Sequence, residues 1–138
     1  MKFSPPFKEL NINPKCDLLL FQKPEPKPAS KILQEDLHDL WKDTLAKSDY
    51  AYIGCLKVRN ISFPFCLDLR DKNLPVYSID TYWSEQQLCL LHPRLKDFYA
   101  FMRLVDKNKN ELKTSLEKLK QTLPNEIEFK EFWNYLII

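Results

Sequence analysis

The chain has 138 residues, of which 44% are hydrophobic, 13% aromatic and 29% charged, and its formal net charge is +2. This length and composition suit a single folded domain with a substantial core and exclude a disordered chain. The near-neutral charge argues against direct nucleic-acid binding, and no apolar run is long enough to span a membrane. The single glycine, Gly54, excludes glycine-rich loops that hold phosphates or dinucleotides.

The first 29 residues form a proline-rich arm, with prolines at positions 5, 6, 14, 24, 26 and 28. Such spacing prevents a helix, so we expect packed irregular structure in which residues 16–21 could pair as a short edge strand. The first residues also lack the apolar core of a signal peptide. We therefore expect a cytoplasmic protein.

A first helix is predicted over residues 31–47, with Ser30 as its N-cap. Its apolar residues recur at helical spacing and form one face: Leu33, Leu37, Leu40, Trp41 and Leu45. We expect this face to pack on a sheet and to place Trp41 in the core. His38 flanks the face and is expected at the helix surface.

Four apolar runs then predict a sheet, at residues 52–58, 63–69, 76–79 and 88–91. Apolar and polar residues alternate over 63–69, which favours a half-buried strand, whereas apolar residues on both faces of the first run favour an inner strand. The connections are too short for crossover helices. The sheet is therefore predicted to be mainly antiparallel.

The remainder of the chain predicts three helices. Pro93 opens the first, whose buried stripe is Leu95, Phe98, Met102 and Val105, supported by Phe101. The next carries Leu112, Leu116, Leu119 and Leu123 and is stopped by Pro124. Asn125 is expected to cap the last, in a capping box with Glu128. The fold class is therefore α+β, a mainly antiparallel sheet flanked by helices with a C-terminal helix pair.

The cysteines, Cys16, Cys55, Cys66 and Cys89, include no close pair. Without a secretion signal, free and mostly buried thiols are the expected state. Together with His38 and His92, the cysteines lack the spacing of a zinc site, so no metal is expected. Because a buried cysteine usually acts as a small hydrophobic residue, we expect none of the four to be essential for binding.

The central stretch resembles the SUKH superfamily, a group that includes many bacterial immunity proteins. The matching residues are Trp41, Tyr52-Ile53-Gly54, Phe65-Cys66-Leu67-Asp68-Leu69, Pro75-Val76-Tyr77, and Phe98 with Phe101. The resemblance covers about residues 30–104. It divides the single domain into an arm (1–29), a SUKH-like core (30–105) and a C-terminal helical extension (106–138).

The resemblance implies a non-enzymatic domain without a cofactor that binds a protein, most simply an immunity protein that neutralises a cognate bacterial toxin. The expected contact surface combines the loop over residues 80–85 with the turn at Arg70 and Asp71, which we expect to be its neighbour. The candidate partner-binding residues are Asp68, Arg70, Asp71, Tyr77, Asp80, Tyr82, Trp83 and Glu85. Should this surface fail, Phe132 and Trp133 are the next candidates.

Two other functions remain open. A small enzyme would use the polar residues that strand order could cluster, namely Asp68, Asp80, His92 and Cys89. A secreted bacterial effector is the second alternative, because lysine-rich helices near a C-terminus are common in such proteins. In a purely structural interpretation, Trp83 folds back onto the core, and Asp68 and Arg70 lie on a solvated strand face.

Overall fold

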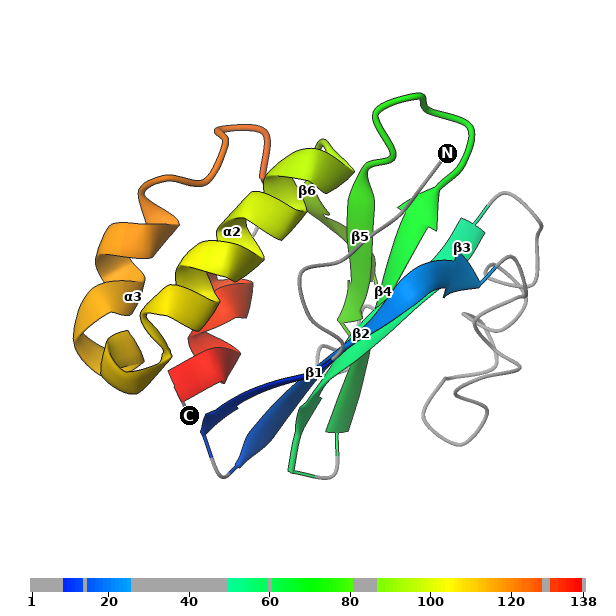
Figure 1. The fold of residues 1–138 in the computed structure, drawn as a ribbon. Coiled ribbons are helices and arrows are strands. Elements are labelled where there is room, and N and C mark those ends of the chain that lie inside the picture. Colours follow the sequence, from blue (N-terminus) through cyan, green and yellow to red (C-terminus); the bar gives the residue numbers. More distant parts are fainter. Residues whose placement is uncertain are drawn as a thin grey trace.

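The computed structural model describes residues 9–13, 15–25, 50–59, 61–80, 87–127 and 130–137. The predicted helix over 31–47, with Trp41 and His38, lies outside these residues, and so does the loop over 81–86. The described chain forms an antiparallel sheet with helices packed against it (Figure 1). The predicted α+β class is therefore confirmed.

The sheet has six strands in the order β1-β2-β3-β4-β5-β6, and every neighbouring pair is antiparallel. The strands are β1 (Glu9–Asn13), β2 (Cys16–Glu25), β3 (Tyr50–Val58), β4 (Ile61–Asp68), β5 (Val76–Asp80) and β6 (Gln87–His92). The four predicted runs correspond to β3, β4, β5 and β6, apart from Leu69, which already belongs to the turn after β4.

The N-terminal arm differs from the sequence prediction. Instead of irregular structure, its described residues form a hairpin of β1 and β2, and β2 pairs with β3 on its other side. Residues 16–21 are therefore part of an inner strand, and β1 is the edge. The reason is that Leu18 and Leu20 enter the core, where burial outweighs the tendency of the prolines in this part of the chain, Pro24 of β2 included, to break regular structure.

The helices lie together on one side of the sheet (Figure 1). They are α2 (Leu95–Lys107), the short η2 (Lys109–Glu111), α3 (Leu112–Lys120) and the 3₁₀ segment η3 (Lys130–Ile137). The predicted apolar stripes of α2 and α3 are buried, as the helical spacing indicated. The helix expected to open at Pro93 begins two residues later, at Leu95, because Arg94 is extended and acts as its N-cap.

The last helical segment also begins later than predicted. Residues 125 and 126 lie in a turn, in which the Ile127 amide donates to the carbonyl of Pro124 over 3.3 Å. Asn125 therefore does not cap a helix, and Glu128 lies outside the described residues. The segment η3 is nevertheless central, since Phe132, Trp133 and Leu136 are completely buried.

The core consists largely of aromatic rings between η3, α2 and the helix side of the sheet. The ring of Phe65 on β4 lies 5.5 Å from Phe98, 6.1 Å from Phe132 and 6.3 Å from Trp133, measured between centroids. Phe63, the previous inward residue of β4, stacks on Tyr135 at 4.7 Å. Phe132 and Trp133 therefore hold the helices to the sheet, and the proposal that they form a reserve binding surface is wrong.

The central strands are buried on both faces. Tyr52, Cys55 and Cys66 point away from the helices, as strand alternation requires, yet each is only 1% exposed. This confirms the predicted inner position of β3. The β-bulge in β3 requires glycine at position 54. The φ of Gly54 is +150°, and a Cβ there would overlap the Leu19 carbonyl oxygen of β2.

Candidate functional site

A cluster of polar and aromatic side chains lies where β4 ends and the turn to β5 begins. Asp68 is the last residue of β4 and pairs in register with Tyr50, the first residue of β3. Because Leu67 faces the aromatic core, Asp68 faces the opposite side of the sheet. Strand pairing therefore brings Tyr50 beside Asp68 although 17 residues separate them in sequence.

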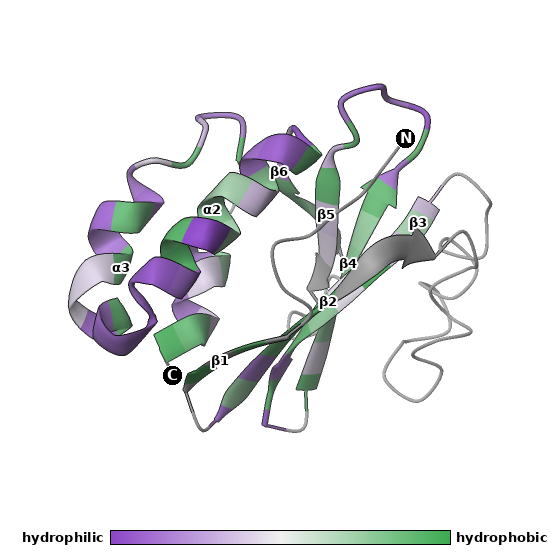
Figure 2. Ribbon diagram, in the orientation of Figure 1, coloured by the Kyte–Doolittle hydropathy of each residue, from purple (hydrophilic) through white to green (hydrophobic). Residues whose placement is uncertain are grey.

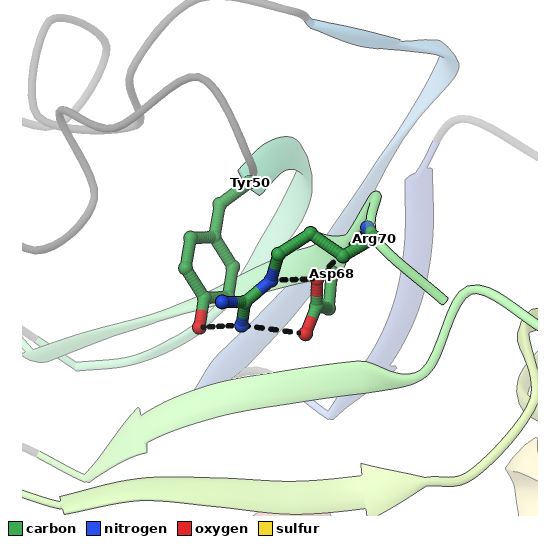
Figure 3. Close-up of polar contacts among 3 residues, drawn as sticks. All are labelled: Tyr50, Asp68 and Arg70. Atoms are coloured by element: carbon green, nitrogen blue, oxygen red, sulfur yellow. Dashed lines mark hydrogen bonds and ion pairs between the residues drawn. The ribbon is translucent and has the colours of Figure 1, made fainter. Parts of the chain in front are cut away.

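Arg70 joins these two residues (Figure 3). Its Nε and Nη2 each donate to the Asp68 carboxylate over 2.9 Å, and its backbone amide donates to Oδ1 over 3.0 Å. Nη2 also donates to the Tyr50 hydroxyl over 3.3 Å, and Cζ lies 5.6 Å from the centre of the Tyr50 ring. A bidentate ion pair with Asp68 and a cation–π contact with Tyr50 therefore hold the Arg70 guanidinium in place.

The electrostatics of the cluster link a fourth residue, Tyr77 of β5. Hydrogen bonds from the Arg70 side chain hold the pKa of the Asp68 carboxyl below its ordinary value. Burial raises the pKa of Tyr77, and the charge of Asp68 and the neighbouring Tyr50 and Asp71 add to this rise. At neutral pH, Asp68 is thus ionised and Tyr77 keeps its hydroxyl proton.

The turn that carries Arg70 is itself held in place. The Asp71 carboxylate accepts from the Asn73 amide over 2.8 Å, and the Asp71 carbonyl accepts from the Leu74 amide over 3.0 Å. The Asn73 carbonyl then accepts from the Leu95 amide over 3.1 Å, which ties the turn to the start of α2. Figure 2 shows this turn as a hydrophilic segment at one end of the sheet.

The structure brings together half of the residues predicted for partner binding. Asp68, Arg70 and Tyr77 belong to the cluster and Asp71 lies in the adjoining turn, and the side chain of Arg70 is 61% exposed. Sequence reasoning missed Tyr50, because only the strand register places it beside Asp68. A search for residues opposite Asp68 in a predicted β3–β4 hairpin would have found it.

The remaining predicted residues do not join the cluster within the described chain. Asp80 ends β5, whereas the Arg70 turn precedes it; at roughly 3.3 Å per residue, Asp80 lies about 13 Å from Val76. The expectation that the two connections are neighbours is therefore wrong for Asp80, because the length of β5 separates them. Tyr82, Trp83 and Glu85 lie outside the described residues.

The polar set considered for an enzyme does not come together as a whole, because Asp68 is separated from His92. His92 pairs with Val76 on the helix side of the sheet, whereas Asp68 faces the other side. No disulfide joins the four cysteines, all of which lie among the described residues: Cys16, Cys55 and Cys66 are buried, Cys89 is half-buried, and burial raises the pKa of Cys66 to about 12. Among the described residues, no three His, Cys, Asp or Glu side chains come close enough to hold a metal ion.

Two further findings concern the kind of protein this is. None of the helices in the described part of the chain is both long and apolar enough to cross a membrane. Comparisons with protein-family models, with curated proteins and with solved structures found no match.

Proposed function

We propose that the protein is a non-enzymatic protein-binding domain and that the cluster of Tyr50, Asp68, Arg70 and Tyr77 is central to its contact surface. The observation that carries this proposal is the guanidinium of Arg70, which is exposed to solvent yet held by Asp68 and Tyr50. We call these four residues the Arg70 cluster.

Residue type supports the proposal. Arginine and tyrosine are enriched among the few interface residues that dominate binding energy, because each combines a large contact area with directed hydrogen bonds. Arg70 and Tyr50 offer both on one small patch. The side chain of Arg70 is also largely exposed, so a partner can reach its guanidinium.

Preorganisation supports it further. A free arginine side chain loses considerable rotamer freedom when a partner binds, and this loss weakens association. Arg70 is already held in one position by hydrogen bonds and by the Tyr50 ring, and the turn beneath it is tied to α2. A partner would therefore meet a surface that needs little rearrangement.

The specific function that we propose is neutralisation of a cognate bacterial toxin, as the resemblance of residues 30–104 to the SUKH superfamily implies. An immunity protein must bind its toxin quickly and tightly, and fixed charges at the centre of an interface favour both orientation and association rate. The Arg70 cluster supplies such fixed charges on an otherwise near-neutral chain.

The test is co-expression and binding with a toxin domain encoded next to the gene of this protein. The parent should protect cells and bind the toxin, and Arg70→Ala should weaken binding at least tenfold, or about 1.4 kcal/mol. Arg94→Ala is the matched control, because Arg94 also forms an exposed ion pair, with Asp97, but at the start of α2. Its affinity should stay within threefold of the parent.

A parent that neither binds nor protects would refute the toxin-neutralising function. Binding that survives Arg70→Ala unchanged would instead remove the Arg70 cluster from the contact surface. The double variant Tyr82→Ala and Trp83→Ala then tests the second predicted contact region, the loop over residues 80–85. If that variant also binds within threefold of the parent, the predicted surface as a whole is wrong.

A further inference from the structure

A second feature lies on the helix side of the molecule, away from the Arg70 cluster. A cleft of about 310 Å³ opens between α2 and the turn that follows α3. Its walls are mostly apolar and include Phe101, Leu104, Leu123 and Pro124. This volume is at the lower end of the range for small-molecule sites, which are typically apolar with a few polar groups.

The unusual residue of this cleft is His92, at the end of β6. It is 1% exposed, and its ring lies 5.4 Å from Phe98, 5.6 Å from Phe101 and 5.9 Å from Trp133. Neither imidazole nitrogen has a hydrogen-bond partner among the described residues. Buried polar groups are nearly always paired, so an imidazole with two unpaired nitrogens beside a cleft calls for an explanation.

The other polar groups that line the cleft are already engaged. Asp97 accepts from Arg94 Nε over 2.7 Å, and Thr122 Oγ1 donates to the Leu119 carbonyl over 2.7 Å. Burial lowers the pKa of His92 to about 4, so the ring is neutral at physiological pH. A neutral imidazole offers one donor and one acceptor, and no unpaired charge among the described lining residues would balance a charged ligand.

We propose that this cleft binds a small, uncharged and mainly apolar molecule with one hydroxyl group, which hydrogen-bonds to His92. The apolar walls select the body of the ligand. A hydroxyl group donates and accepts, so it pairs with either ring nitrogen whichever one carries the proton. This proposal does not depend on the toxin-neutralising function, because the cleft and the Arg70 cluster lie on opposite sides of the sheet.

The test compares 4-methylphenol with para-xylene, which has a methyl group in place of the hydroxyl. Both are titrated into the ¹⁵N-labelled protein at pH 7, and the ring nitrogens of His92 are followed by long-range ¹H–¹⁵N NMR. We expect 4-methylphenol to bind about tenfold more tightly than para-xylene and to shift one ring nitrogen of His92. Phenylalanine at this position, His92→Phe, should bring the two affinities within threefold of each other.

A second variant guards against misfolding of His92→Phe. Ala100 lines the cleft from an exposed position of α2, so Ala100→Trp should fill the cleft without disturbing the core. It should abolish binding of both probes. The proposal is overturned if 4-methylphenol does not bind at millimolar concentration, if it binds without shifting the His92 nitrogens, or if Ala100→Trp binds it as well as the parent.

Discussion

The aromatic core and the Arg70 cluster are built from adjacent residues of the same strand but are held together by different forces. Leu67 of β4 is fully buried beneath the helices, and the next residue, Asp68, faces the other side and holds Arg70. The core depends on apolar area and shape, which are not directional. The cluster depends on charge-assisted hydrogen bonds between partly exposed groups, which fix geometry and add little stability.

This difference separates the expected roles of the two regions. Changes in the aromatic core should lower the free energy of unfolding and affect binding only through loss of folded protein. Changes in the Arg70 cluster should leave the fold intact and affect only the contact with a partner. His92 is the exception within the core, since it is a polar ring in an apolar environment.

The largest effect is expected for Trp133→Ala. The side chain is fully buried and contacts the rings of Phe65, Phe98 and Phe101, so its removal should lower the free energy of unfolding by about 3–5 kcal/mol. Urea denaturation measures the change. Leu69→Ala is the control, because Leu69 is 41% exposed, and it should cost about 0.5 kcal/mol or less. A loss below about 1 kcal/mol for Trp133→Ala would contradict the packing of η3.

His92 should make the core sensitive to acid. Its pKa in the folded protein is about 4, below the ordinary value of 6.5, so protonation favours the unfolded chain. The stability from neutral His92 is complete above pH 6.5 and is lost as the pH falls toward 4. At about 1.4 kcal/mol per pKa unit, the loss amounts to about 3 kcal/mol.

The measurement compares the parent with His92→Phe, in which all other titrating groups are the same. The free energy of unfolding of the variant relative to the parent should rise by about 3 kcal/mol between pH 7 and pH 4. Parallel pH profiles for the two proteins would show that burial does not disfavour protonation of His92 in the folded state. That outcome would also weaken the contrast between an aromatic core that excludes charge and the charged Arg70 cluster.

The smallest effect on stability is expected for Arg70→Met, which keeps much of the stem and removes the charge. Since the Arg70 side chain is 61% exposed, the free energy of unfolding should fall by less than about 1 kcal/mol. The pKa of Asp68, measured by NMR titration of its carboxyl carbon, should rise toward its ordinary value once the hydrogen bonds are lost. A loss above about 2 kcal/mol would mean that the cluster is a structural element.

Much of the fold could be predicted because its signals are local. The alternation of Phe63, Phe65 and Leu67 with polar or smaller residues marks one face of a strand wherever that strand sits. The stripe of Leu95, Phe98 and Met102 does the same for α2. All of the candidate site except Tyr50 was predicted, because Asp68, Arg70, Asp71 and Tyr77 are close in sequence on one hairpin.

What local signals could not predict depends on contacts between distant segments. The hairpin of β1 and β2 forms because β2 pairs with β3 and buries Leu18 and Leu20 in the core. The positions of the prolines in the arm do not indicate this stabilisation. The register of β3 with β4 decides that Tyr50 meets Asp68 and Arg70. Packing of η3 likewise decides that Phe132 and Trp133 are core residues and not a surface. Periodicity is a property of a few neighbouring residues, whereas burial and pairing are properties of the whole chain, and only the folded structure combines them.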